Sequence, residues 1–294
     1  MALPPHPWPT GLAERPQPLA DPLVRRILAP NASPYTYTGT QTYLVGDQDA
    51  VIVIDPGPAE EAHLDALTAA IGGARVIAIA CTHTHRDHSP AAAPLAARTG
   101  APIIGCAPLT LEDDGPRADA AFDTDYRPDR VLTDGEQLTG PGFTLTALAT
   151  PGHTSNHLCF ALEETGALFT GDHVMGWSTS VVAPPDGDMG DYMNSLARLY
   201  DRQDRIYYPA HGAPIDKPRQ FVRSMIGHRR QRERQILSLL GEGVGSIPAM
   251  VARMYAGLDP RLIGAAGRSV LAHLIDLDRR GLALRDGDSF SLPS

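Results

Sequence analysis

Short apolar runs with the lengths of buried strands alternate with helical patterns over most of the chain. Aliphatic and β-branched residues fill the segments 41–46, 50–57 and 74–83, which predicts strands covered on both faces. The segments 60–73 and 90–99 repeat apolar residues at helical spacing, which predicts two helices. Strands that alternate with helices are typical of an α/β fold.

Further predicted strands end in polar residues. The runs 143–153, 166–173 and 205–212 finish at PGH, GDH and AHG, and the run 156–164 lies between the first two. Polar residues that follow buried strands gather where loops converge on an active site held by a rigid sheet. The stretch 107–130, which contains Gly, Pro and many Asp, predicts a long loop or a short helix.

Composition divides the chain of 294 residues into three parts. Residues 1–34 are rich in proline, so we expect an extension that packs on the surface, with the first strand near Tyr35. Residues 35–215 contain the α/β pattern. In residues 216–294, three helical runs precede a hairpin-like segment, which predicts a winged-helix-like α+β domain.

Charge also separates the last part from the rest. Residues 216–294 carry 13 basic and 8 acidic side chains, a net charge of +5, whereas residues 1–215 carry 12 and 26, a net charge of −14. No apolar run approaches the roughly 20 residues needed to cross a bilayer. The N-terminus lacks the basic start and apolar stretch of a secretory signal, so we expect a cytoplasmic protein without a membrane partner.

The densest cluster of candidate ligands directly follows the run 74–83. The sequence THTHRDH places His83, His85, Asp87 and His88 within six positions. On an extended backbone His83 and His85 point the same way, and a turn at Asp87 and His88 can aim those two side chains at a neighbouring point. This pattern favours two adjacent metal ions over one.

Three more candidate ligands follow later strands. His153, Asp172 and His211 each have Gly or Pro beside them, which lets the backbone turn sharply toward a shared cleft. Two zinc ions that share a bridging group need about six to eight protein contacts, which the combined set supplies.

This ordered set resembles the metallo-β-lactamase superfamily, and the likeness covers roughly residues 35–215. The resemblance implies an αββα sandwich with two divalent metal ions, zinc being the expected metal. It assigns His83, His85 and His153 to one ion, Asp87, His88 and His211 to the other, and Asp172 to a bridge between them. It also matches Asp55 to an aspartate that orients the metal loop without binding metal.

Two metal ions lower the pKa of a shared water, so a hydroxide nucleophile exists near neutral pH. Asp87 and Asp172 are the candidate catalytic residues that accept the proton of the attacking water, and we favour Asp87. The dedicated lactamases of this superfamily typically lack an aspartate in the place of Asp172. We therefore expect β-lactam hydrolysis only as a promiscuous side activity.

The flanking segments SPYTYTGTQTYLVG, TPGHTSNH and DYMNSL, together with the helical tail, resemble lactamase-beta-like hydrolases with a C-terminal winged helix. That branch includes thioesterases acting on acyl carrier protein and an endoribonuclease that cuts single-stranded RNA. Both a small acyl substrate and single-stranded RNA are therefore candidate substrates. The acidic catalytic part repels a polyanion, so we favour a thioester or ester carbonyl. Asn156, Tyr192 and Asn194 are candidates for the substrate pocket, with capping or core packing as the alternative.

A DNA-binding regulator is the non-enzyme alternative. Six arginines of the first helix of the tail would form its phosphate-facing stripe: Arg219, Arg223, Arg229, Arg230, Arg232 and Arg234. Charge runs on helices are usually solvated faces, so we favour a helix that packs the tail on the catalytic domain or on another subunit. A homo-oligomer formed through the C-terminal domain remains open.

Overall fold

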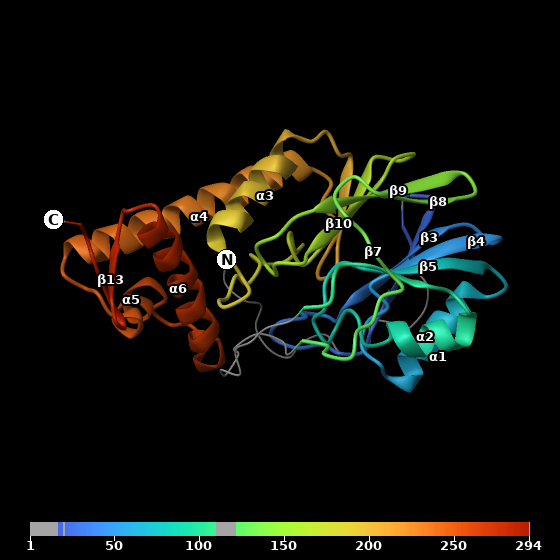
Figure 1. Ribbon diagram of the computed structural model, residues 1–294, viewed down its shortest axis with the longest axis horizontal. Coiled ribbons are helices and arrows are strands. Elements are labelled where there is room, and N and C mark those ends of the chain that lie inside the picture. The colour runs from blue at the N-terminus through green and yellow to red at the C-terminus, as the bar shows by residue number, and fades with distance from the viewer. Residues whose placement is uncertain (1–16, 20, 110–121, 294) are drawn as a thin grey trace.

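The computed structural model describes residues 17–19, 21–109 and 122–293, which form an α/β part and a smaller C-terminal part (Figure 1). Residues 1–16 of the expected extension and residues 110–121 of the expected loop lie outside the described residues. The two sheets of the α/β part face each other and carry helices on their outer sides. This arrangement confirms the predicted αββα sandwich.

Within the described residues, the first sheet has seven strands that lie side by side in chain order. They are β1 (Gln17–Pro18), β2 (Val24–Leu28), β3 (Gln41–Gly46), β4 (Ala50–Ile54), β5 (Arg75–Cys81), β6 (Ile103–Gly105) and β7 (Arg130–Val131). The first four are antiparallel, and β4 to β7 are parallel. The helices α1 (Glu61–Ile71) and α2 (Ala92–Thr99) make the crossovers that parallel pairing requires.

The expectation that the first strand begins near Tyr35 is wrong. Strand β2 pairs with β3 across the register Val24↔Val45 to Leu28↔Gln41. Val24 and Ile27 are fully buried in the core, so this segment is part of the sheet and not a surface wrap. Pairing with β3 holds this segment in an extended conformation, and the proline-rich sequence around it does not indicate that pairing.

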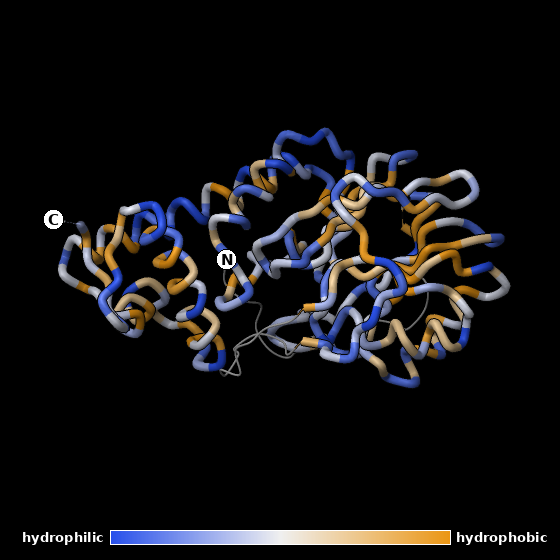
Figure 2. The backbone as a smooth tube through the Cα atoms, viewed as in Figure 1, coloured by the Kyte–Doolittle hydropathy of each residue, from blue (hydrophilic) through white to orange (hydrophobic). Residues whose placement is uncertain are grey.

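The second sheet has five strands in the order β12-β11-β10-β9-β8 among the described residues. They are β8 (Gln137–Gly140), β9 (Phe143–Ala149), β10 (Leu158–Leu162), β11 (Ala167–Gly171) and β12 (Ile206–Pro209), and the helix α3 (Met189–Asp201) packs on the outer side. Between the sheets, Tyr43 of β3 contacts Phe169 and Tyr208 of the other sheet, at ring-centre distances of 5.0 and 5.7 Å. Figure 2 shows apolar strands gathered at this interface.

The C-terminal part contains the expected three helices and hairpin. Its elements are α4 (Pro218–Gly241), α5 (Ile247–Met254), the short 3-10 helix η1 (Pro260–Leu262), α6 (Ile263–Arg279), β13 (Leu284–Asp286) and β14 (Ser289–Ser291). Apolar side chains such as Leu240, Met250, Leu274 and Phe290 form a core of its own. Helix α4 extends from the side of α3 to the far end of this part (Figure 1). Among the described residues, no helix is both long and apolar enough to cross a membrane.

The arginines of α4 do not form one exposed stripe. Arg229 is 3% exposed, donates to the Ser180 carbonyl and lies over the ring of Tyr192. Arg219 and Arg232 lie over the rings of Tyr200 and Tyr255, at 4.7 and 4.5 Å from the ring centres. Half of the arginines proposed for a phosphate-binding stripe therefore pack against aromatic rings, which is a correction to the DNA-binding alternative.

Candidate active site

The seven predicted metal ligands meet at one end of the two facing sheets. His83, His85, Asp87 and His88 follow β5, whereas the others follow strands of the second sheet. His153 comes after β9, Asp172 directly after β11 and His211 two residues after the end of β12. Each sheet therefore contributes side chains from strand ends to a shared site.

Three imidazoles form the first group of this site. The Nε2 of His83 lies 3.0 Å from Nδ1 of His85, and Nε2 of His153 lies 3.1 Å from the same atom. Asp172 joins them, with its Oδ2 3.6 Å from Nε2 of His153. Ligand atoms at about 2.0–2.1 Å from a tetrahedral zinc ion are about 3.3 Å apart. These spacings therefore fit one metal ion.

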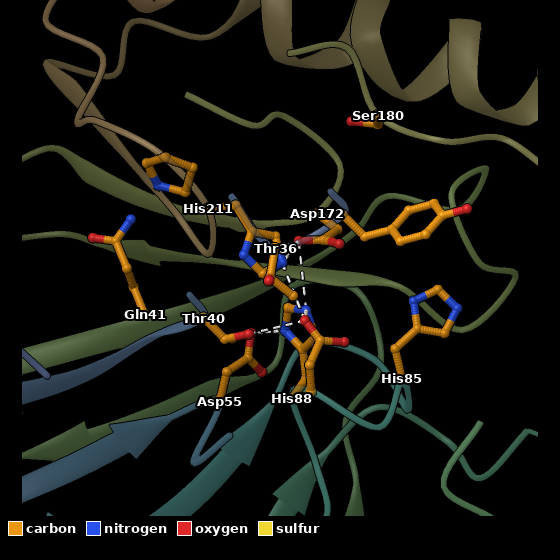
Figure 3. A network of polar contacts seen from close by, with 12 residues as sticks. Thr36, Thr40, Gln41, Asp55, His85, His88, Asp172, Ser180 and His211 are labelled. Carbon is orange, nitrogen blue, oxygen red and sulfur yellow. Dashed lines mark hydrogen bonds and ion pairs between the residues drawn. The ribbon is translucent and has the colours of Figure 1, made fainter. Parts of the chain in front are cut away.

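Asp87, His88 and His211 form the second group. The Oδ2 of Asp87 lies 3.2 Å from Nε2 of both histidines. The other oxygen of Asp172, Oδ1, lies 3.2 Å from Nε2 of His211 and 3.5 Å from Nε2 of His88. Asp172 thus turns one carboxylate oxygen to each group, as a bridging ligand would. Figure 3 shows Asp172, His88 and His211 pointing toward one another, with Asp55 beside His88.

Buried atoms without partners also suit metal ions. Nε2 of His88 and Oδ1 of Asp172 are buried and form no hydrogen bond among the described residues, and the polar atoms that face them belong to other candidate ligands. Such buried atoms are costly unless a bound ion completes them. Burial, followed by neighbouring histidines, lowers the pKa of His83 well below its usual value and that of His85 to about 3. Both are therefore neutral, which is the form that binds metal.

The carboxylates of the site remain charged. Burial opposes ionisation of Asp172, but His211 and His88 outweigh it and hold the pKa of Asp172 well below its usual value. Burial likewise opposes ionisation of Asp87, and the same two histidines lower its pKa. In turn Asp172 and Asp87 outweigh burial and raise the pKa of His211 to about 10. Two buried carboxylates provide the negative charge that divalent cations require.

Asp55 belongs to neither ligand group, but it contacts the start of the loop that carries four of the candidate ligands. Its Oδ1 accepts from the Thr82 backbone N–H at 2.7 Å, and its Oδ2 accepts from the Thr82 hydroxyl at 2.8 Å. Oδ2 also lies 3.0 Å from Nδ1 of His88. These contacts orient the start of the metal loop and direct Nε2 of His88 toward the second group, as expected of a residue that positions a ligand.

Other supports were not predicted from the sequence. The Thr40 hydroxyl donates to Oδ2 of Asp87 at 2.9 Å, and Asn31 in turn donates to that hydroxyl at 2.9 Å. Nδ1 of His153 lies 2.6 Å from the Val181 carbonyl, whose neighbour Ser180 is held by Arg229 of α4. The C-terminal part therefore contacts a segment that orients a ligand histidine.

The site opens into a pocket of about 370 Å³. Its lining combines five of the candidate ligands with residues from three other segments: Asn31, Ser33, Tyr35, Thr36, Pro58, His85, Arg86, Asp87, His153, Asp172, Met175, Val181 and His211. The surface is mainly apolar. The segment 31–36 was not among the predicted pocket residues, although the quoted motif SPYTYTG contains most of it.

None of the three candidate substrate residues is in this lining. Tyr192 is fully buried and donates from its hydroxyl to the His173 carbonyl. Asn156 donates to the Ala107 carbonyl at 2.7 Å, which ties two loops together. Asn194 lies exposed on α3. The packing alternative describes the first two positions better.

Gly152 allows the turn that delivers His153. Its φ of +134° is in the region that favours glycine, and a Cβ there would collide with the backbone of Tyr192. We expect Gly152→Ala to lower the free energy of unfolding by about 3 kcal/mol, measured by urea denaturation. Gly73→Ala is the control, because a Cβ at Gly73 meets nothing within 4 Å, and a change within about 1 kcal/mol is expected. Equal stability of both variants would contradict the assigned constraint.

The fold and the site define a class of αββα hydrolases with paired His and Asp ligand groups. A family model described as the metallo-beta-lactamase superfamily matches residues 35–211, and one described as a beta-lactamase associated winged helix domain matches residues 246–291. The chain belongs to the metallo-β-lactamase superfamily and is a hydrolase of that class. The predicted C-terminal winged helix is confirmed.

Curated relatives are identical to this chain at about a third of the aligned positions. The lactamase-like protein adaB of Aspergillus niger is 34% identical over 251 residues, which cover 80% of this chain and 74% of that protein. An atrochrysone carboxyl ACP thioesterase of Aspergillus chevalieri is 35% identical over 223 residues, which cover 75% of this chain and 67% of that protein.

Solved structures share the fold over nearly the whole chain. A beta-lactamase domain protein from Burkholderia ambifaria superimposes with a TM-score of 0.79 at 20% identity, covering 96% of this chain and 94% of that one. A metallo-beta-lactamase family protein from Thermus thermophilus gives 0.74 at 23% identity, covering 94% and 100%. At this identity the likeness concerns the fold.

Proposed function

We propose that this hydrolase uses two divalent metal ions, zinc being the expected metal, to cleave the thioester bond of an acyl group carried by an acyl carrier protein. The observation that carries the proposal is the position of Asp172, whose two oxygens face the two ligand groups at a mainly apolar pocket. The apolar lining suits an acyl chain. Relatives named ACP thioesterases support the same chemistry.

His83, His85 and His153 would hold one ion, Asp87, His88 and His211 the other, and Asp172 both. When bound, the two ions lower the pKa of a water and polarise the scissile carbonyl. Thr40 holds Oδ2 of Asp87, which leaves Oδ1 to take the proton of the attacking water. As the water oxygen bonds to the carbonyl carbon and the C–S bond breaks, Asp87 passes this proton to the departing sulfur.

Cleavage of RNA is less favoured by this pocket. Among the described residues that line it, Arg86 is the only arginine or lysine. A single-stranded nucleic acid channel normally combines a positively charged groove with exposed aromatic rings. The net charge of −14 over residues 1–215 adds long-range repulsion of a polyanion.

The test is release of thiol from an acyl thioester of N-acetylcysteamine by the zinc-loaded full chain. We expect His153→Ala to lower kcat/KM by about 100-fold or more, because it removes a ligand from the first group. Asn194→Ala, an exposed position on α3, is the matched control and should retain activity. A fluorescent single-stranded RNA is tested in parallel. RNA cleavage that is lost in His153→Ala, without thioester hydrolysis, would overturn the proposal.

A further inference from the structure

A second pocket, of about 570 Å³, lies where the catalytic part meets the winged helix. One wall is the segment 184–189 of the catalytic part, and the other is formed by α6 and the start of the hairpin. Figure 1 shows α6 on the side of the winged helix that faces the catalytic part. We call this pocket the junction groove.

One stripe of α6 lines the junction groove. Arg268, Leu271, Ile275 and Arg279 follow one another at intervals of three, four and four residues, which places them on the same helix face. The opposite face supplies buried side chains to the core of the winged helix. This stripe therefore has an apolar centre and a positively charged arginine at each end. Arg285 of β13 adds a third positive charge to the lining.

Within the described part of the chain, the side chains of two of these three arginines, Arg268 and Arg285, form no ion pair. Arg268 donates to the Pro184 carbonyl at 3.0 Å, and Arg285 lies 5.8 Å from the ring centre of Phe290. Among the described residues, neither is within ion-pair distance of a carboxylate. Of the described residues that line the groove, Asp188 is the only acidic one, and it is paired with Arg279. The groove thus keeps an excess of positive charge, in a chain whose catalytic part is strongly acidic.

The junction groove is close to the active site. Val181 lines the active-site pocket, and Pro184 lines the groove. Three residues of extended chain span at most about 11 Å, so the linings of the two pockets come within about that distance of each other at this segment. Leu282 and Leu284, near Arg285 in the chain, are among the exposed large apolar side chains of the described residues and add apolar surface to this module.

We propose that the junction groove is the docking site for the acidic carrier protein that delivers the acyl thioester. This inference rests on the proposed function and adds the surface that recognises the carrier. Positive residues around an apolar stripe suit an acidic, amphipathic partner helix, since opposite charges steer the encounter and apolar contacts hold the complex. The carrier is thereby placed where its acyl arm has a short path to the catalytic pocket.

The test compares two substrates that carry the same acyl group, one on an acyl carrier protein and one on N-acetylcysteamine. For Arg268→Glu/Arg285→Glu we expect KM for the carrier substrate to rise about 10-fold or more, with kcat unchanged. Hydrolysis of the N-acetylcysteamine thioester should be unaffected, which also shows that the variant is folded. Arg223→Glu/Arg230→Glu makes the same charge change at exposed positions of α4 outside the groove, and should alter KM by no more than about twofold.

An unchanged KM in the groove variant, or an equal rise in the control, would overturn the docking site. If the wild type hydrolyses neither thioester, the proposed function fails and the groove is tested by binding alone. Isothermal titration calorimetry with the unacylated carrier should then show binding that Arg268→Glu/Arg285→Glu weakens about 10-fold. Absence of binding, or equal binding by the variant, would contradict the inference.

Discussion

Replacing Asp172 with asparagine is expected to lower kcat/KM for thioester hydrolysis by about 10³-fold, equivalent to about 4 kcal/mol of activation free energy. The shape of the side chain is preserved, but one carboxylate oxygen becomes an NH₂ group that repels a cation. In the wild type Oδ1 faces His88 and His211, and Oδ2 faces His153. Either orientation of the amide therefore deprives one ligand group of its negative oxygen.

Metal content provides a second readout that does not depend on the substrate. After dialysis against a weak chelator, the Asp172→Asn variant should retain about one ion per chain or less, measured by elemental analysis, where the wild type retains about two. Asp191→Asn, which removes an exposed carboxylate from the first turn of α3, should match the wild type. Full retention of two ions by Asp172→Asn would show that this carboxylate does not bridge them.

The gathering of the seven candidate ligands could be predicted because each of them has a local signature. Four ligands occur within six positions after a strand, and His153, Asp172 and His211 follow strands at glycine- or proline-containing turns. Gly171 shows the physical reason, since its φ is +48° and a side chain there would meet His157 and Thr82. Turns of this kind depend on residues that are neighbours in the sequence, so they can be predicted without knowledge of the fold.

Packing between segments far apart in the sequence could not be predicted in the same way. Strand β2 contains two arginines and little apolar periodicity, and its register depends on β3. Arg229 lies in a run of charged residues that resembles a solvated helix face, yet α4 packs it beneath Ser180 and Tyr192. Tyr192 offered a clearer signal, because Met189, Tyr192, Leu196 and Leu199 share one buried face of α3. Helical periodicity alone would have placed it in the core.

Replacing Asp55 with asparagine should weaken metal binding although Asp55 is not itself one of the candidate ligands. The native carboxylate receives the Thr82 backbone N–H on one oxygen and faces the Thr82 hydroxyl and His88 Nδ1 with the other. An amide has one acceptor and one donor end. If the NH₂ group faces the Thr82 backbone, a buried N–H loses its acceptor, which costs about 1–3 kcal/mol.

The opposite orientation of the amide affects the ligand directly. The NH₂ group would then face Nδ1 of His88 and favour the tautomer with its proton on Nε2, the atom that faces Asp87 and Asp172. A protonated Nε2 does not bind metal. We expect metal affinity at the second group to fall about 10–100-fold in chelator competition, and the free energy of unfolding to fall by about 2 kcal/mol.

Backbone strain does not confound this substitution. Asp55 has a φ of +48°, and asparagine tolerates that conformation at least as well as aspartate. Asp49→Asn, at the exposed turn between β3 and β4, is the control and should leave metal affinity and stability unchanged. If Asp55→Asn kept the wild-type affinity for both ions while losing stability, Asp55 would act on the fold alone. Loss of affinity at the second group, with the first retained, would instead assign to Asp55 the orientation of His88.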